Sequence, residues 1–161
     1  MRLAKYLSTG LAVTAVAAVV AAEHAQVRYP DGYREWAHVK SMLIDEGHAL
    51  AGLVQGLHHI YANKQAMRGY KNRPFPEGSV IAFDLLTPVA GDKQTTEGAR
   101  KAVIVMEKNK KKFADTGGWG YEVFGGDSRT DRKVGGGAKQ ACFGCHTSQK
   151  DRDFVFSDWR R

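Results

Sequence analysis

Two cysteines and a histidine near the C-terminal end form the most reactive group of residues in the sequence. Cys142 and Cys145 are the only cysteines among the 161 residues, two residues separate them, and His146 follows directly. This Cys-x-x-Cys-His spacing is typical of c-type haem attachment. The two thiols can form thioethers with the vinyl groups of a porphyrin, and the adjacent imidazole can bind the iron. The pattern predicts one covalently bound haem c with His146 as the proximal ligand, and the cofactor carries the chemistry.

Three other roles are open to a Cys-x-x-Cys pair: a thioredoxin-type redox centre, a structural disulfide, or half of a zinc site. A zinc site needs two further ligands at regular spacing. The sequence has no second cysteine pair, and its other histidines lie far upstream. A thioredoxin motif follows an early strand of a βαβ unit, whereas this pair lies near the C-terminus. The histidine after the pair favours haem.

The first 22 residues have the features of a secretory signal peptide. Two basic residues begin the segment, residues 11–20 are apolar, and Val20-Ala21-Ala22 is a small-residue cleavage site. The apolar run is shorter than the roughly 20 residues that span a bilayer. We therefore expect a signal peptide over residues 1–22, a single haem domain over residues 23–161 and no membrane span in the mature protein. Export to the periplasm agrees with haem c, which bacteria attach outside the cytoplasm.

The composition limits the partners that the protein can bind. The chain carries 24 basic and 17 acidic residues, a formal net charge of +7, and two of the basic residues lie in the signal segment. A mildly positive protein suits an acidic redox partner, although plain solubility explains the same charge. The densest basic cluster, Lys108 and residues 110–112, lacks the interleaved aromatic residues of single-strand binding sites. We therefore expect no nucleic acid partner.

Four segments have the composition of β-strands. Branched aliphatic and aromatic residues are concentrated in residues 58–62, 79–87, 101–107 and 119–124, with turn residues between them. The sustained 3.6-residue periodicity of a helical bundle is missing from most of the chain. The pattern predicts an α+β domain with a largely antiparallel sheet, a few flanking helices and the single haem c packed against the sheet.

Three helices are expected around these strands. Apolar residues recur at steps of three and four from Tyr33 to Leu43, which predicts an amphipathic helix there. Asn63 can cap a brief helix that ends near Tyr70, and a short helix from about Ala138 is expected to carry the haem motif. The stretches that remain include a loose arm over residues 23–29 and a polar loop over residues 88–98.

Taken together, these features resemble the cytochrome P-460 / cytochrome c′-beta family. The similarity covers roughly residues 33–148 in the same order. It rests on Tyr33-Arg34-Glu35-Trp36, His59-Ile60-Tyr61-Ala62-Asn63, Phe75-Pro76-Glu77-Gly78 before a strand, Gly117-Gly118-Trp119-Gly120-Tyr121, and the Cys-x-x-Cys-His motif. The resemblance implies a largely antiparallel sheet, usually a homodimer, and one haem c whose distal side is open to ligands.

The resemblance also implies one of two functions. The cytochrome P-460 enzymes oxidise hydroxylamine and carry a lysine–porphyrin cross-link. The c′-beta branch lacks the link and binds nitric oxide or carbon monoxide behind an apolar cap. The cross-linking lysine is expected in the strand after the Phe-Pro-x-Gly turn, where this sequence has Phe83 and no lysine from Ser79 to Thr87. We predict a gas-binding protein without a catalytic residue, with Phe83 in the distal pocket and Asp84 pointing to the opposite face.

A six-coordinate electron carrier is the third possibility. Met42, Met67 or Met106 could bind the iron, although a methionine among apolar residues is more often part of the core. His58 and His59 are adjacent on one expected strand, so one of them points inward. A hydrogen bond in the pocket or to a propionate is the favoured role of that histidine, and iron ligation is the alternative.

Overall fold

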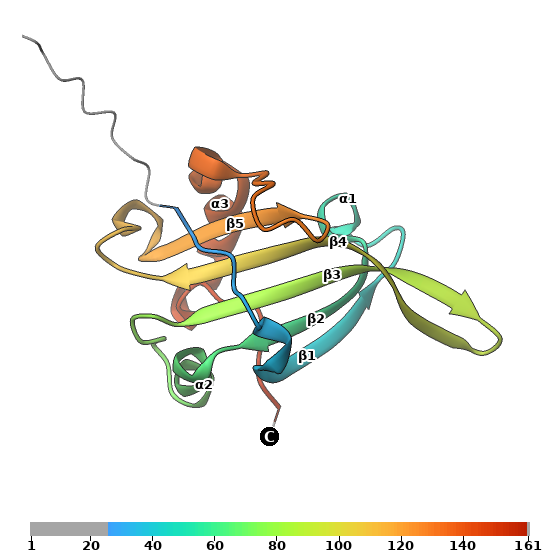
Figure 1. Ribbon diagram of the computed structural model, residues 1–161. Coiled ribbons are helices and arrows are strands. Elements are labelled where there is room, and N and C mark those ends of the chain that lie inside the picture. Colours follow the sequence, from blue (N-terminus) through green and yellow to red (C-terminus); the bar gives the residue numbers. More distant parts are fainter. Residues whose placement is uncertain (1–25, 161) are drawn as a thin grey trace, which may run out of the picture.

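The computed structural model describes residues 26–160, and its centre is one five-stranded antiparallel sheet (Figure 1). Each strand pairs with its neighbours in the sequence, in the order β1-β2-β3-β4-β5. The strands are β1 (Ala37–Ile44), β2 (Gly56–Ala62), β3 (Val80–Gly91), β4 (Gln94–Lys108) and β5 (Trp119–Gly125). The sheet confirms the predicted α+β class and all four segments expected to be strands. The signal segment lies outside the described residues and stays a prediction.

The helical elements are short. Asn63 caps α2 as the sequence predicted, because its side-chain oxygen accepts a hydrogen bond from the Ala66 N–H at 2.8 Å. In the part of the chain that the structure describes, no helix is long and apolar enough to cross a bilayer. The helices are α1 (Ala51–Val54), α2 (Lys64–Lys71) and α3 (Gly144–His146), with a π-helical turn at Lys139–Phe143 and 3-10 turns at Tyr33–Glu35, Ala114–Thr116, Gly135–Gly137 and Thr147–Arg152.

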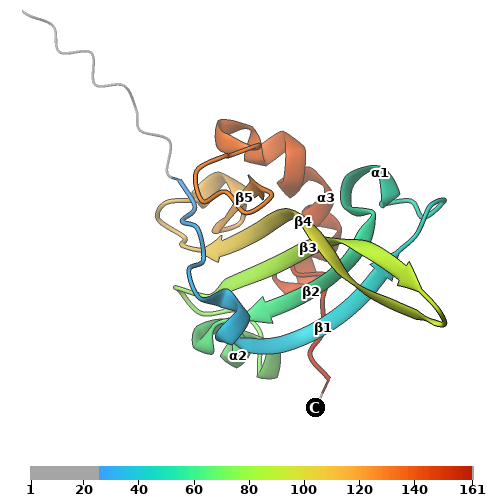
Figure 2. The ribbon, with the colours of Figure 1, turned by 45° about the vertical axis from the view of Figure 1, so that its right-hand side comes forward.

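The sheet separates two hydrophobic clusters. Ile60 and Phe83 are cross-strand partners on one face, which we call the inner face. The C-terminal segment covers part of this face, and Cys142 packs against the same cluster as Ile60. The opposite, outer face carries Val103 and is covered by N-terminal residues that include Val27. Figure 2 shows the C-terminal segment and the N-terminal stretch on opposite sides of the sheet.

The helix predicted from Tyr33 to Leu43 is wrong. Only a 3-10 turn forms at Tyr33–Glu35, and β1 follows it. The register between β1 and β2 shifts between His38 and Lys40, which leaves Val39 as an extra residue in β1. Such a bulge interrupts the two-residue alternation of a strand. Because Val39 is buried out of phase with the rest of β1, the apolar spacing resembled that of a helix.

The polar loop predicted over residues 88–98 is also wrong. β3 and β4 continue as a two-stranded arm beyond the sheet, with Pro88 opposite Glu97 and Gly91 opposite Gln94. The arm is visible as the hairpin that leaves the sheet in Figure 2. Most of its side chains are exposed. Polar residues therefore suit both of its faces, and the alternation that marks a half-buried strand is missing.

The N-terminal stretch is packed rather than loose, at least over residues 26–29. Val27 is buried against the outer-face cluster, and its carbonyl accepts a hydrogen bond from the Arg132 side chain at 2.8 Å. Tyr29 packs edge-on against Phe124 of β5, with ring centroids 5.1 Å apart. This stretch forms no helix or strand, so the packing of its side chains and hydrogen bonds between its backbone and the side chains of Glu107 and Arg132 hold it in place.

Candidate haem site

The Cys-x-x-Cys-His motif lies on one continuous helical turn. Cys142 lies in the π-helical part, which ends at Phe143, and Cys145 and His146 belong to α3. Residues three apart on a helix lie on the same side, so the two thiols face one region. Both cysteines are free, with Cys142 half-buried and Cys145 exposed. Burial raises the pKa of the Cys142 thiol to about 11, which keeps it protonated.

The imidazole of His146 is oriented by the backbone. Its Nδ1–H donates a hydrogen bond to the Phe154 carbonyl at 2.7 Å, which leaves Nε2 with its lone pair available for a metal. Tyr121 and Phe156 flank the ring at centroid distances of 4.9 and 5.0 Å. Burial lowers the pKa of His146, so the neutral form that binds iron is favoured. Backbone orientation of this kind is typical of metal-binding histidines.

The carbonyl that accepts this bond lies in a constrained segment. Asp153 and Phe154 both have left-handed backbone conformations, with φ of 52° and 64°, which non-glycine residues seldom adopt. The Asp153 carboxylate accepts hydrogen bonds from Lys108 Nζ at 2.7 Å and the Phe75 N–H at 2.9 Å. The Asp153 carbonyl accepts one from Trp119 Nε1 at 2.9 Å. These contacts hold the segment and thereby aim the Phe154 carbonyl at His146.

The inner face of the sheet gives the site an apolar wall. Phe83 is half-buried and packs against the cluster that also contacts Cys142. Asp84 is fully buried and is paired with arginines on the outer face. This confirms that Phe83 and Asp84 point to opposite sides. One row of cross-strand partners on the inner face consists of Lys40, Ile60, Phe83, Ile104 and Val123.

Two buried polar side chains on the inner face have no partner. Neither ring nitrogen of His58, nor the hydroxyl of Tyr121, has a hydrogen-bond partner among the described residues. His58 lies opposite Leu85 and Tyr121 lies opposite Met106, both within the sheet. Native proteins seldom leave such atoms unpaired. The free thiols, the oriented imidazole and these unpartnered atoms together fit a haem, which brings polar groups that the chain does not supply.

A family model, Cytochrome P460, matches residues 30–157, a range that includes all five strands and the Cys-x-x-Cys-His motif. The chain belongs to the cytochrome P460 family. Membership confirms the family resemblance seen in the sequence and implies a haem cofactor. It does not separate gas binding from hydroxylamine oxidation. No curated protein matches the chain.

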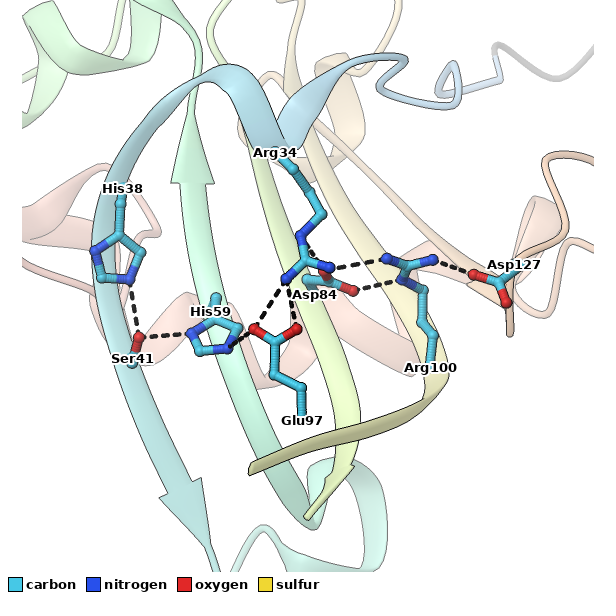
Figure 3. Close-up of polar contacts among 8 residues, drawn as sticks. All are labelled: Arg34, His38, Ser41, His59, Asp84, Glu97, Arg100 and Asp127. Atoms are coloured by element: carbon cyan, nitrogen blue, oxygen red, sulfur yellow. Dashed lines mark hydrogen bonds and ion pairs between the residues drawn. The ribbon is translucent and has the colours of Figure 1, made fainter. Parts of the chain in front are cut away.

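The two adjacent histidines of this cytochrome P460 family member have different surroundings. His58 points to the inner face, as expected for one of the pair. His59 points to the outer face, where its Nε2 lies 2.8 Å from Glu97. Figure 3 shows His59 within a chain of polar contacts. That chain comprises His38, Ser41, His59, Glu97, Arg34, Asp84, Arg100 and Asp127.

The position of Lys40 on the inner face was not expected from the sequence. Lys40 lies directly opposite Ile60, in the same row of the inner face as Phe83. It was missed because residues 33–43 were expected to be helical, which gives no register with the other strands. The strand after the Phe-Pro-x-Gly turn has no lysine, and Lys40 lies two strands away from it in the sheet. Met106, in contrast, is buried in β4 as core, as the sequence indicated.

Proposed function

We propose that this cytochrome P460 family member is a mono-haem c protein that binds nitric oxide or carbon monoxide at an open, apolar distal site. Cys142 and Cys145 would hold the haem through thioethers, and His146 Nε2 would be the proximal iron ligand. When bound, the haem supplies an iron that can take up a diatomic gas. The residues of the chain hold it, orient the imidazole and exclude water.

The placement of Phe83 carries this proposal. Its ring lies on the inner face, in a row whose other members from β2, β4 and β5 are aliphatic. A phenyl ring can neither bind iron nor accept a proton. A distal side lined in this way disfavours water, hydroxide and hydroxylamine and favours neutral diatomic ligands. Asp84, the nearest carboxylate along β3, is unavailable as a base because it points to the outer face.

Lys40 supports hydroxylamine oxidation as the second candidate function. Its side chain is exposed and lies on the inner face, two strands from Phe83. Neighbouring strands are spaced by about 4.8 Å, so the Cα atoms of Lys40 and Phe83 are on the order of 10 Å apart. An extended lysine side chain covers much of that distance. Lys40 is therefore the residue that we would test for the lysine–porphyrin link of the enzymes.

An absorption spectrum of the dithionite-reduced protein, before and after carbon monoxide, separates the candidates. High-spin ferrous haem that shifts with carbon monoxide supports gas binding. A strongly red-shifted Soret band indicates a lysine–porphyrin link, and the Lys40→Met variant should then lose that band. Low-spin haem without rapid carbon monoxide binding indicates a six-coordinate electron carrier and contradicts both proposals.

We also propose that the protein is exported and acts in the periplasm as a homodimer. A redox partner protein would keep its iron reduced. The signal-like residues 1–22 and the requirements of haem c attachment support export. Mass spectrometry of the secreted protein should find an N-terminus at Glu23. Sedimentation velocity should give twice the mass of one chain, and a monomer at micromolar concentration would contradict the dimer.

A further inference from the structure

His58 is the most conspicuous polar residue on the inner face. Its side chain is 0% exposed, and both of its ring nitrogens lack a partner in the described part of the chain. The imidazole stacks on Phe83, with ring centroids 4.0 Å apart and planes inclined by 19°. Its cross-strand partners are Met42 and Leu85, which are apolar. The chain thus surrounds one imidazole with apolar groups beside the proposed distal ring.

These apolar surroundings determine the protonation state of the His58 imidazole. Burial lowers the pKa of His58 to about 4, and the charges of His59 and Lys40 act in the same direction. The side chain is therefore neutral near pH 7, with one N–H donor and one acceptor nitrogen. A neutral donor is suited to a neutral or weakly polarised partner. A haem propionate would be better paired by a cation such as Lys40.

An unpartnered imidazole has an energetic cost. Leaving a buried donor or acceptor unsatisfied costs about 1–3 kcal/mol, whereas an apolar residue of similar shape would cost nothing of this kind. Phenylalanine would preserve the stacking on Phe83 and the packing against Leu85. Stacking alone therefore gives no reason for a histidine, and the polar nitrogens need a partner that arrives with the haem.

We propose that the N–H of His58 donates a hydrogen bond to the diatomic ligand bound on the distal side, and that Phe83 holds the imidazole plane by stacking. This inference rests on the proposed gas-binding function. It changes the chemistry of the site, because one donor in an otherwise apolar pocket favours ligands that acquire negative charge on the iron. His58 is then a specificity-determining residue, which selects between nitric oxide and carbon monoxide.

The test is the infrared C–O stretching frequency of the ferrous carbon monoxide complex, together with its dissociation rate. His58→Phe keeps the stacking but removes the donor. We expect the C–O stretching frequency of this variant to rise. Carbon monoxide should dissociate about three- to tenfold faster, which corresponds to the loss of one hydrogen bond. His58→Gln, which restores an N–H, should recover part of both effects. His59→Gln changes the neighbouring histidine on the outer face and should leave both unchanged.

The outcomes distinguish this inference from the proposed function. If the wild-type ferrous protein does not bind carbon monoxide, the gas-binding function is wrong. If it binds but His58→Phe leaves the stretch and the rate unchanged, His58 is a packing residue only. Low-spin wild-type haem that becomes high-spin in His58→Phe would make His58 an iron ligand and overturn the inference. Should the variants fail to fold, the absence of a C–O shift in wild-type protein transferred to D₂O overturns it as well.

Discussion

At the scale of single residues, the site combines two unpaired thiols with one imidazole that the backbone orients. The two thiols remain free, and the Nδ1–H of His146 is engaged by the Phe154 carbonyl. That bond fixes which imidazole nitrogen remains for iron. His58 has the opposite character, because nothing in the described chain engages either of its nitrogens.

The first residue-scale prediction concerns haem attachment. Cys142→Ser or Cys145→Ser should each leave one thioether, and the double variant should release its haem on acid–acetone extraction. The reason is that a hydroxyl does not add to a porphyrin vinyl group as a thiol does. Haem-stained denaturing gels and intact mass measure the result. Ser148→Ala, a neighbouring polar change, should retain covalent haem, and covalent haem in the double variant would refute the assignment.

The second concerns the pH dependence of stability. The pKa of His58 is about 4 in the folded protein against an ordinary value of 6.5, so the unfolded chain binds the proton first. Stability should therefore fall as the pH drops from about 6.5 to about 4, by up to about 3 kcal/mol. Below pH 4 this contribution should be constant.

Urea unfolding at a series of pH values measures this effect. His58→Phe should remove the part of the slope between pH 4 and 6.5, while other titrating groups contribute equally to both proteins. Parallel stability profiles for the wild type and the variant would show that His58 is not buried as a neutral imidazole.

At the scale of elements, the segment after α3 connects the haem motif to the sheet. Lys108, at the end of β4, is 2% exposed and donates to the Asp153 carboxylate and to the Gly117 carbonyl. Its ammonium also lies over the Trp119 ring, 4.9 Å from the centroid. This ion pair, in which Lys108 is buried and Asp153 is partly buried, helps to keep Asp153 and Phe154 in their left-handed conformations, and the position of the Phe154 carbonyl depends on them.

Lys108→Met should therefore lower the free energy of unfolding by about 3 kcal/mol, because the Asp153 carboxylate loses its positively charged partner. Chemical denaturation followed by circular dichroism gives the value. Lys110→Met, an exposed lysine two residues on, serves as the control and should change stability by less than about 0.5 kcal/mol. Equal effects of the two substitutions would mean that the pair does not hold the segment.

At the scale of the whole molecule, the two faces of the sheet differ: the inner face carries the residues of the proposed haem site, and the outer face carries ion pairs. The inner face carries Phe83 and His58 and meets the C-terminal segment. The outer face buries Asp84 between Arg34 and Arg100, which come from the N-terminal turn and from β4. One sheet thus presents an apolar wall on one side and an ion-pair network, drawn in Figure 3, on the other.

Asp84→Asn should destabilise the protein by about 3 kcal/mol without altering the visible spectrum of the haem. The carboxylate is 0% exposed, and its loss leaves the guanidinium groups of Arg34 and Arg100 close together without the anion that lies between them. Asp127→Asn, which removes an exposed partner of Arg100, should have little effect. Urea midpoints and absorption spectra of both variants are the measurements. A changed haem spectrum in Asp84→Asn would show that the two faces are coupled.

The elements differ in how far local sequence could predict them. β3 and β5 are rich in branched and aromatic residues, and Asn63 supplies a helix cap, so local preference and final structure agree. The prediction for the residues of β1 was wrong because Val39 lies at a bulge, and only pairing with β2 creates that bulge. The prediction of a loop for the arm after Leu86 was wrong because both faces of the arm are exposed to solvent, and such strands have no apolar alternation.

The sequence by itself determined the reactive motif, the family and the alternation that separates Phe83 from Asp84. The motif and the alternation depend on neighbouring residues, and the family depends on the order of short motifs along the chain. Tertiary structure alone decided that the Phe154 carbonyl orients His146, that Lys40 shares a row with Phe83, and that His58 is buried without a partner. His146 and Phe154 are 8 residues apart in the sequence, Lys40 and Phe83 are 43 apart, and the stacked His58 and Phe83 are 25 apart. Strand register and a constrained backbone segment bring them together, and neither leaves a local pattern in the sequence.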